Sequence, residues 1–249
     1  CYKVDKIIAT YDFLFNSDND IQTIPFKIEG KNAGKQKYIV QIETTDDEFT
    51  LVNNRAEVFI EVLDNKQKIL IAAASPHPDI AALKTAIEKN INYQVEIIDV
   101  MDYAGKLNDY NLVVLNNIPS VNGGEDKLMA DIEKEKTPVL YFIGTQTQFS
   151  SFNKLKCGLS VVAPKGVTNS KASLNPGFNS FTIEERLKNL LPDLPPLEIP
   201  IAGDYKVSTG DNILLYQNRG SNITSYPLVG LNEQNKQKIG FVLDEAIWR

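Results

Sequence analysis

The sequence predicts a mixed α/β protein, in which a small all-β sandwich precedes a doubly wound, mostly parallel sheet with helices on both faces. Residues 1–64 alternate apolar and polar side chains with the period of a strand. Residues 65–249 instead alternate continuous apolar runs with helical patterns. A chain of 249 residues is also long enough for two domains. We therefore expect a domain boundary between residues 64 and 65.

Three segments of the first part have the composition of strands: IQTIPFKIEG, KQKYIVQIET and AEVFIEVLD. Turn-forming clusters, NSDND, GKNAG and TTDDE, lie before, between and after the first two. In the second and third segments, every other residue is apolar and shares one face of the strand: Tyr38, Val40 and Ile42, then Val58, Ile60 and Val62. Such half-apolar faces need a second sheet to cover them, so a small sandwich is expected.

From Lys66 the pattern changes to strands and helices in alternation. QKILIAAAS is a continuous apolar strand, and PDIAALKTAIEKN is a helix for which Asp79 is the expected N-cap. The same step repeats through the strand YQVEIIDV, a helical turn near YAGKLNDY, the strand NLVVLNN, the helix GEDKLMADIEKEK and the strand PVLYFIG. Strands that are apolar on both faces are typical of a parallel sheet covered on both sides.

After about Ser160 the pattern becomes less regular. FTIEERLKNLL, residues 181–191, is expected to form a short helix, and the rest of the region is expected to cross the domain surface. Later strands are predicted in NILLYQN, YPLVGLNE and KIGFVLDEA. Because no helix follows the last of these, we expect the chain to be a fragment of a longer protein.

Composition argues against several classes of function. The chain has 26 basic and 32 acidic residues, a net charge of -6, and no basic cluster that would neutralise phosphates, so nucleic acid is not expected as a partner. No apolar run reaches the roughly 18 to 20 residues that cross a bilayer, so this segment is not expected to enter a membrane. Cys1 and Cys157 are the only cysteines and form no CxxC pair. Neither a metal nor a cofactor is therefore expected.

The stretch IAAASPHPDIAAL contains the only histidine, His77, between two prolines. It follows the first parallel strand, at the edge where open α/β sheets place ligands. A histidine base needs a nucleophile to activate or a carboxylate to orient it, and only Ser75 and Asp79 are near in sequence. The preferred interpretation is a solvated loop histidine, and the alternative is a role at the mouth of a cleft.

Three other motifs favour structural interpretations. NSDND carries Asn16, Asp18 and Asp20 at the first positions of a calcium loop, but the required glycine and glutamate do not follow, so a turn is preferred. NGGED opens a helix and could cradle an anion, but loop flexibility and capping account for it. Asn116 and Asn117 end the strand where a phosphoacceptor aspartate would have to stand, which argues against a receiver domain.

Taken in order, the segments resemble known domains. GKQKYIVQIETTDDEFTLVNNRAEVFIEVLD resembles the closing strands of a CARDB or similar immunoglobulin-like domain. KILIAAASPHPDIAALKTAIEKN, YNLVVLNNIPS, PVLYFIGTQTQF and IGFVLDEAIWR resemble the class I glutamine amidotransferase-like domain of large bacterial membrane-anchored proteins, which often carry von Willebrand A regions. The resemblance implies a flavodoxin-like fold and a bacterial cell envelope location, on the periplasmic face.

The catalytic residues of the enzymatic relatives are not matched. Where they keep a nucleophilic cysteine on a G-x-C-x-G elbow, this chain has YFIGTQTQ, and Cys157 lies too far along to replace it. Their catalytic histidine follows a late strand, whereas His77 follows the first. Asp244-Glu245-Ala246 also departs from the Gly-Glu-Gly of relatives, while Trp248 still fits as a packing anchor.

The leading hypothesis is therefore a non-catalytic interaction or assembly module, with other proteins or other domains of its own polypeptide as partners. The alternatives are a divergent hydrolase, for which His77 and Thr145 are the catalytic candidates, and a small-ligand-binding domain. Binding residues are expected at the mouth of the cleft formed by the carboxyl ends of the parallel strands: Ser75, His77, Asp79, Asn117 and Gln146.

Overall fold

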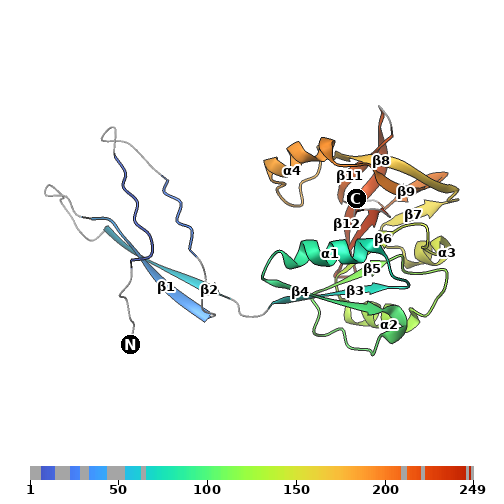
Figure 1. Ribbon diagram of the computed structural model, residues 1–249, viewed down its shortest axis with the longest axis horizontal. Helices are drawn as coiled ribbons and strands as arrows, with labels where there is room; N and C mark the ends of the chain where they lie inside the picture. The colour runs from blue at the N-terminus through green and yellow to red at the C-terminus, as the bar shows by residue number, and fades with distance from the viewer. Residues whose placement is uncertain are drawn as a thin grey trace. The chain divides into compact units, whose positions relative to one another are not determined.

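The structure, a computed structural model, describes residues 7–14, 23–28, 34–43, 54–62, 66–208, 212–219, 222–244 and 247. The chain divides into two compact units, Cys1–Asn65 and Lys66–Arg249, so the division falls one residue after the expected boundary. Figure 1 shows the elements of each unit. The NSDND and TTDDE turns, most of GKNAG, Cys1, Glu245, Ala246 and Trp248 lie outside the described residues.

The first unit contains a two-stranded antiparallel sheet of β1 (Gly34–Gln41) and β2 (Arg55–Val62). Tyr38 pairs with Val58, so the predicted apolar residues do share one face. That face is open: Val40, Val58 and Ile60 are 39%, 42% and 42% exposed. Residues 23–28, expected to be part of a strand, form none, and the described residues of this unit contain no second sheet. The predicted all-β sandwich is therefore not confirmed.

The second unit is built on one nine-stranded sheet with the strand order β4-β3-β5-β6-β13-β12-β11-β8-β9. Its strands, in chain order, are β3 (Gln67–Ala73), β4 (Tyr93–Asp99), β5 (Leu112–Asn116), β6 (Val139–Ile143), β8 (Gly166–Leu174), β9 (Leu197–Ile201), β11 (Asn212–Arg219), β12 (Asn222–Gln234) and β13 (Gln237–Leu243). The α/β class predicted for this part of the chain is thereby confirmed.

The sheet has a parallel half and an antiparallel half. β4, β3, β5, β6 and β13 pair in parallel, in the order 2-1-3-4-5 that is common among doubly wound sheets. β12, β11, β8 and β9 continue the sheet with antiparallel pairs. The region after Ser160, expected to cross the surface, instead supplies β8 and β9. Pairing with neighbours that are distant in sequence makes a strand of β8, whose own sequence is too polar to predict one.

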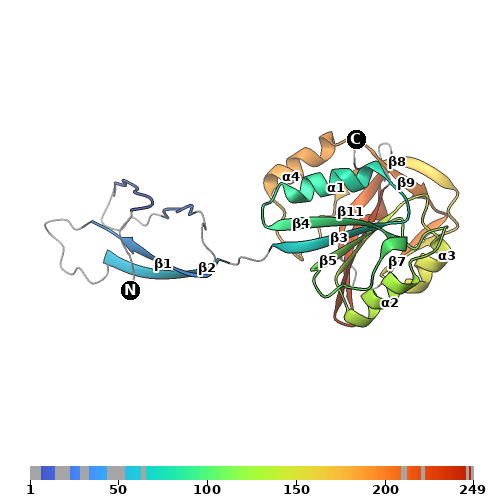
Figure 2. The same ribbon diagram turned by 60° about the horizontal axis from the view of Figure 1, so that its bottom comes forward.

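Two helices cover opposite faces of the parallel half, as Figure 2 shows for α1 (Pro78–Glu88) and α2 (Asp126–Glu135). Ile80 of α1 packs in one core with alternate residues of the strands, among them Ile71 and Val114. Leu128 and Ile132 of α2 belong to the larger core on the other face. The doubly wound arrangement is thus produced by strands that are apolar on both faces.

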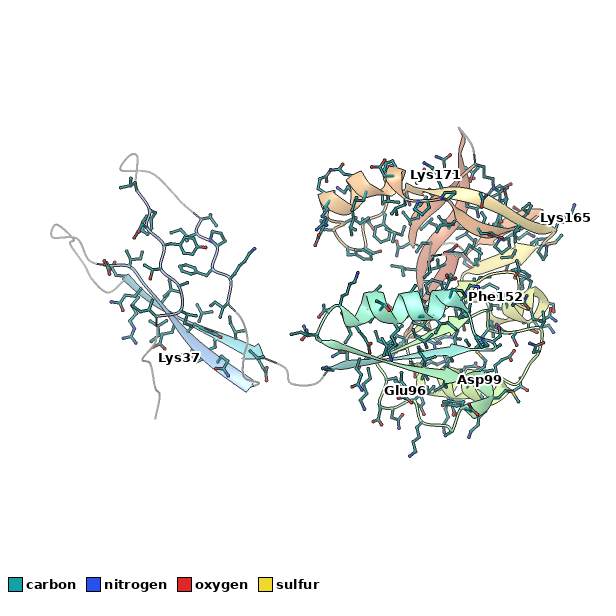
Figure 3. The ribbon with its side chains drawn as sticks, viewed as in Figure 1. Lys37, Glu96, Asp99, Phe152, Lys165 and Lys171 are labelled. Atoms are coloured by element: carbon teal, nitrogen blue, oxygen red, sulfur yellow. The ribbon has the colours of Figure 1, made fainter. Side chains whose placement is uncertain are left out.

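Shorter elements complete the second unit. They are the helices α3 (Phe149–Phe152) and α4 (Glu185–Leu190), the 3-10 turns η2 (Val100–Asp102), η3 (Asn153–Leu155) and η4 (Leu191–Asp193), and the two-stranded sheet of β7 (Leu159–Val162) with β10 (Asp204–Val207). The helix predicted over residues 181–191 is therefore shorter than expected. Phe152, labelled in Figure 3, is fully buried, and its ring meets Tyr141 edge to face at 5.6 Å.

The helical turn predicted near YAGKLNDY forms directly before that segment, as η2, and two tyrosines bond the rest of the connection to its surroundings. The Tyr103 hydroxyl donates to Asp131 of α2 at 2.9 Å, and the Tyr110 hydroxyl donates to Glu96 of β4 at 2.6 Å. Burial and then the bond to Glu96 raise the pKa of Tyr110 to about 12, and burial with the Asp131 bond likewise raises the pKa of Tyr103. Irregular backbone is thus stabilised from outside the segment.

Alkaline pH should destabilise the fold through these tyrosines. The unfolded phenol ionises near 10 while folded Tyr110 holds its proton up to a pKa of about 12. The stabilisation of the folded state by the protonated Tyr110 hydroxyl is therefore complete below pH 10 and is lost as the pH rises through 12. We expect the free energy of unfolding to fall over this interval, and to fall less in Tyr110→Phe. Urea denaturation at a series of pH values measures both; equal slopes in the two proteins would contradict the prediction.

Both outer edges of the sheet are protected. At β9 the protection comes from Pro200, which has no N–H to offer a further strand. At β4 the Val95 N–H donates to Glu88 Oε1 of α1 at 3.0 Å. Tyr93 and Ile97 of this edge are 38% and 42% exposed, so the edge is apolar. By occupying the Val95 N–H, the carboxylate of Glu88 hinders this strand from pairing with a strand of another molecule.

Replacing Glu88 by alanine should therefore promote self-association. The substitution frees the Val95 N–H at an apolar edge, and we expect the weight-average mass in sedimentation to rise with concentration more steeply than for the wild type. Glu88→Gln keeps an oxygen that can accept the bond and should behave like the wild type. Identical sedimentation of Glu88→Ala and Glu88→Gln would show that the edge is not guarded in this way.

Candidate functional site

The candidate site lies at the carboxyl ends of the parallel strands. In the order 2-1-3-4-5 the chain leaves β3 and β5 in opposite directions, and ligands of doubly wound sheets bind beside such a switch point. Ala73 of β3 pairs with Asn116 of β5, so the segments that follow them begin side by side. These segments carry Ser75, His77 and Asn117, which the sequence predicted to line the cleft.

His77 is the N-cap of α1, so the expectation that Asp79 would cap this helix was wrong. Pro78 occupies the first turn, as its fixed φ favours, and Asp79 follows it. His77 Nδ1 lies 3.3 Å from the Asp79 backbone nitrogen, which donates to it, and 3.2 Å from Asp79 Oδ2. The Asp79 side chain is fully buried and that of His77 is 23% exposed. His77 is thus a structured residue and not a freely solvated one, although it remains reachable from solvent.

One nitrogen cannot accept from the backbone and donate to the carboxylate at the same time. With its proton on Nε2, His77 caps the helix; with a proton on Nδ1, it donates to Asp79. The second arrangement is the carboxylate-oriented imidazole of acid–base catalysis.

Two substitutions at His77 distinguish these roles. His77→Ala removes both interactions and should lower the free energy of unfolding by about 1 kcal/mol, the usual worth of an N-cap. His77→Asn retains a side-chain oxygen for the cap but no imidazolium, so it should match the wild type in urea denaturation. If His77→Asn loses as much stability as His77→Ala, the contact with the Asp79 carboxylate is the important one.

Asn117 joins the segment after β5 to the segment after β6. Its backbone is left-handed, with φ 54°, and its side chain is buried. Asn117 Oδ1 accepts hydrogen bonds from the Gly144 N–H at 2.9 Å and from the Thr147 hydroxyl at 3.1 Å. The Gly144 N–H also donates to Thr147 Oγ1 at 3.2 Å. The segment at the elbow position is therefore held by a buried network.

The carboxylate of the residue that directly precedes α2 turns toward Ser120 and makes no cap hydrogen bond with the helix. Glu125, its N-cap residue, is buried, and it accepts from the Ser120 N–H at 3.0 Å and from the Ser120 hydroxyl at 3.4 Å. The Gly123 N–H donates to Ser120 Oγ at 3.1 Å. NGGED is therefore a turn held by its own hydrogen bonds, but the capping expected of it is absent, because the N-cap residue Glu125 makes no side-chain bond to the helix.

Three more polar residues belong to the α1 face at this edge. Strand alternation places Asn116 with Val114, and Asp244 with Val242, on the face that α1 covers. Both are buried, as is Asp79 in the first turn of α1. Asp244 follows β13, and its N–H donates to Ile143 at 3.2 Å. Asn116 and Asp244 share a signal that the sequence offers: each is a polar residue at, or directly after, the end of an apolar strand.

The predicted residues are therefore brought together only in part. His77 contacts Asp79, and Asn117 contacts the segment after β6, but no hydrogen bond within the described ranges joins Ser75 to His77. Ser75, Thr145 and Gln146 are exposed. Among the described residues, no three His, Cys, Asp or Glu side chains cluster as metal ligands would. No helix in the described ranges has the length and apolar character needed to cross a membrane.

Comparisons with known proteins give distant structural likenesses. No family model and no curated protein matches the chain. A β-galactosidase from Bacillus circulans sp. alkalophilus is 11% identical with a TM-score of 0.44, over 73% of this chain and 29% of that one. A Thermoplasma acidophilum protein, provisionally assigned to GMP synthase, is 13% identical with a TM-score of 0.42, over 72% and 83%. An exo-β-1,4-mannosidase of Opitutaceae bacterium strain TAV5 is 12% identical with a TM-score of 0.44, over 73% and 31%.

The chain thus spans about a third or less of the two glycosidases. At these identities and TM-scores the likenesses assign neither a fold family nor an activity.

Proposed function

We propose that the chain is a non-catalytic interaction or assembly module of a bacterial cell-envelope protein. In this proposal Lys66–Arg249 is a degenerate, flavodoxin-like relative of class I glutamine amidotransferase domains. The preceding unit is a CARDB-type or other immunoglobulin-like module. The partners are other proteins or other domains of the same polypeptide, on the periplasmic side of the membrane.

The observation that carries the proposal is the state of the segment after β6. An amidotransferase nucleophile would stand here, exposed on a sharp turn. In this chain no cysteine or serine stands on the turn: Thr145 is exposed there, and Thr147 is buried with its hydroxyl donating to Asn117 Oδ1. The Gly144 N–H, a donor of the kind that would stabilise an oxyanion, is likewise bonded to Asn117. Donors that a catalyst would leave open to substrate serve here to fix the backbone.

Assays on the purified chain test the lack of catalysis. Glutamine, simple amides and esters should be turned over by the wild type no faster than by Thr145→Ala or His77→Ala. Turnover by the wild type that either substitution abolishes would overturn the proposal.

A photo-crosslinking amino acid tests the interaction directly. Placed at Gln146, which is exposed at the carboxyl edge, it should yield a discrete protein adduct in the native host. Placed at Lys89, exposed at the opposite end of α1, it provides the control. Equal crosslinking from the two positions would contradict recognition through the carboxyl edge.

A second candidate function, small-ligand binding or hydrolysis at the same edge, is favoured by the contact of His77 with Asp79. A buried carboxylate 3.2 Å from Nδ1 can orient an imidazole so that Nε2 meets a ligand. A fragment screen by thermal shift separates this candidate from the first. Binding there should raise the melting temperature of the wild type but not of His77→Asn.

A further inference from the structure

Arg219, at the end of β11, lies against two tyrosine rings from other strands. Its guanidinium carbon is 5.2 Å from the ring centroid of Tyr226 in β12 and 5.9 Å from that of Tyr205 in β10. The two rings are 5.1 Å apart and tilted by 51° to one another. Tyr205 is buried, while Arg219 and Tyr226 are half-buried.

Neutral partners hold the guanidinium in one orientation. Its Nε and Nη2 both donate to Gln217 Oε1, at 3.2 Å and 2.7 Å, and Nη2 also donates to the Tyr205 hydroxyl at 3.3 Å. Gln217 is fully buried, and its amide nitrogen donates to the Pro227 carbonyl at 2.9 Å. The Tyr205 hydroxyl donates to the Pro200 carbonyl. Each acceptor of Arg219 is thus itself fixed, which makes the cation pre-organised.

The positive charge of Arg219 has no carboxylate partner in the described part of the chain. The lysine and arginine ion pairs there join Lys37 and Arg55 to Glu57, and Lys188 to Glu185. Arg219 instead has an amide oxygen, a phenol and two ring faces, and its Nη1 takes part in no hydrogen bond within the described residues. An anion therefore binds with a more favourable free energy to a half-buried cation that is balanced only by dipoles than to a cation that already has a carboxylate partner.

We propose that Arg219, with the Tyr226 ring beside it, binds the carboxylate of a small organic acid. Nη1, which takes part in no hydrogen bond within the described residues, can donate to one carboxylate oxygen, and the ring offers an apolar surface to the rest of the molecule. One guanidinium matches a single negative charge. Lys171, labelled in Figure 3, directs its Nζ to the Pro192 carbonyl at 3.0 Å, and no hydrogen bond within the described residues joins it to Arg219 or Tyr226. The site belongs to β10, β11 and β12 and is independent of the function proposed for the carboxyl edge.

Thermal shift and calorimetry on the full chain test this proposal. Acetate and benzoate, compared with chloride at equal ionic strength, should raise the melting temperature by about 2–5 °C at saturating concentrations. Benzoate should bind more tightly than acetate because its ring can stack on Tyr226. Arg219→Gln should weaken binding at least about tenfold, the usual loss when a charge-assisted hydrogen bond is removed. Arg186→Gln, which removes an exposed arginine of α4, should leave binding unchanged.

A second measurement avoids dependence on the folding of Arg219→Gln. The guanidinium Nε–H resonance of Arg219, assigned by comparison with Arg219→Lys, should move during an acetate titration of the wild type and saturate at the calorimetric affinity. The proposal fails if that resonance does not move, or if Arg219→Gln binds as the wild type does. It also fails if inorganic phosphate binds more tightly than either carboxylate.

Discussion

Asn117→Ala is expected to destabilise the second unit by about 2–4 kcal/mol. The substitution removes the acceptor of both the Gly144 N–H and the Thr147 hydroxyl, in a place where all three residues are buried. An unsatisfied buried polar group costs about 1–3 kcal/mol. Alanine must also adopt the left-handed backbone of Asn117, φ 54°, at a cost of about 1–2 kcal/mol. Urea denaturation of the two proteins measures the difference.

Two further variants separate these contributions. Asn117→Gly relieves the backbone strain but not the lost bonds, so it should be more stable than Asn117→Ala by about 1 kcal/mol. Thr147→Val removes only the hydroxyl, and combined with Asn117→Ala it should cost less than the sum of the two single losses, because they share one network. Strict additivity, or a stable Asn117→Ala, would refute the role assigned to this network.

Local sequence was sufficient for the parallel half of the sheet. β3, β5 and β6 are short runs in which nearly every residue is apolar, and such runs need cover on both faces wherever they lie. α1 and α2 follow from helical spacing of apolar residues. β8, GVTNSKASL, carries no comparable signal, since its stability as a strand comes from pairing with β11 and β9.

The candidate site shows the same division between local and long-range causes. That His77 caps α1 could have been read from Pro78, because proline favours the first helical position and the cap precedes it. The bonds from Asn117 to Gly144 and Thr147 could not, since 27 and 30 residues separate the partners and only the register of β5 with β6 brings them together. Residues that act within one segment were predictable, and those that act between strands were not.

Gly230→Ala is expected to cost about 2–3 kcal/mol, because a methyl group there has no space. Gly230 lies in β12 between Ile213 of β11 and Phe241 of β13, its partners on either side. An added Cβ would be 2.3 Å from Phe241 Cζ and 3.0 Å from Ile213 Cδ1. Phe241 is fully buried and cannot move aside without disturbing the core. Overpacking of this kind typically costs about 1–3 kcal/mol.

Gly203→Ala is the matched control. Its added Cβ would meet only the Val162 carbonyl at 3.6 Å and Ala163 at 3.8 Å, which are ordinary contacts. Loss of a glycine at an unstrained position restricts the unfolded chain, so this variant should be unchanged or more stable by up to about 1 kcal/mol. A similar loss of stability in both variants would mean that the effect at Gly230 is not steric.

The identity of the clashing group is tested by making room for the methyl. Phe241→Leu alone should destabilise the unit by leaving a cavity, yet in combination with Gly230→Ala it should cost less than the two single losses added together. The rescue follows because the shorter side chain vacates the position of Cζ, the atom closest to the new methyl. β13, the strand that carries Phe241, is where the sheet changes from parallel to antiparallel pairing, and the close approach of Phe241 to the β12 backbone explains why glycine is required at position 230.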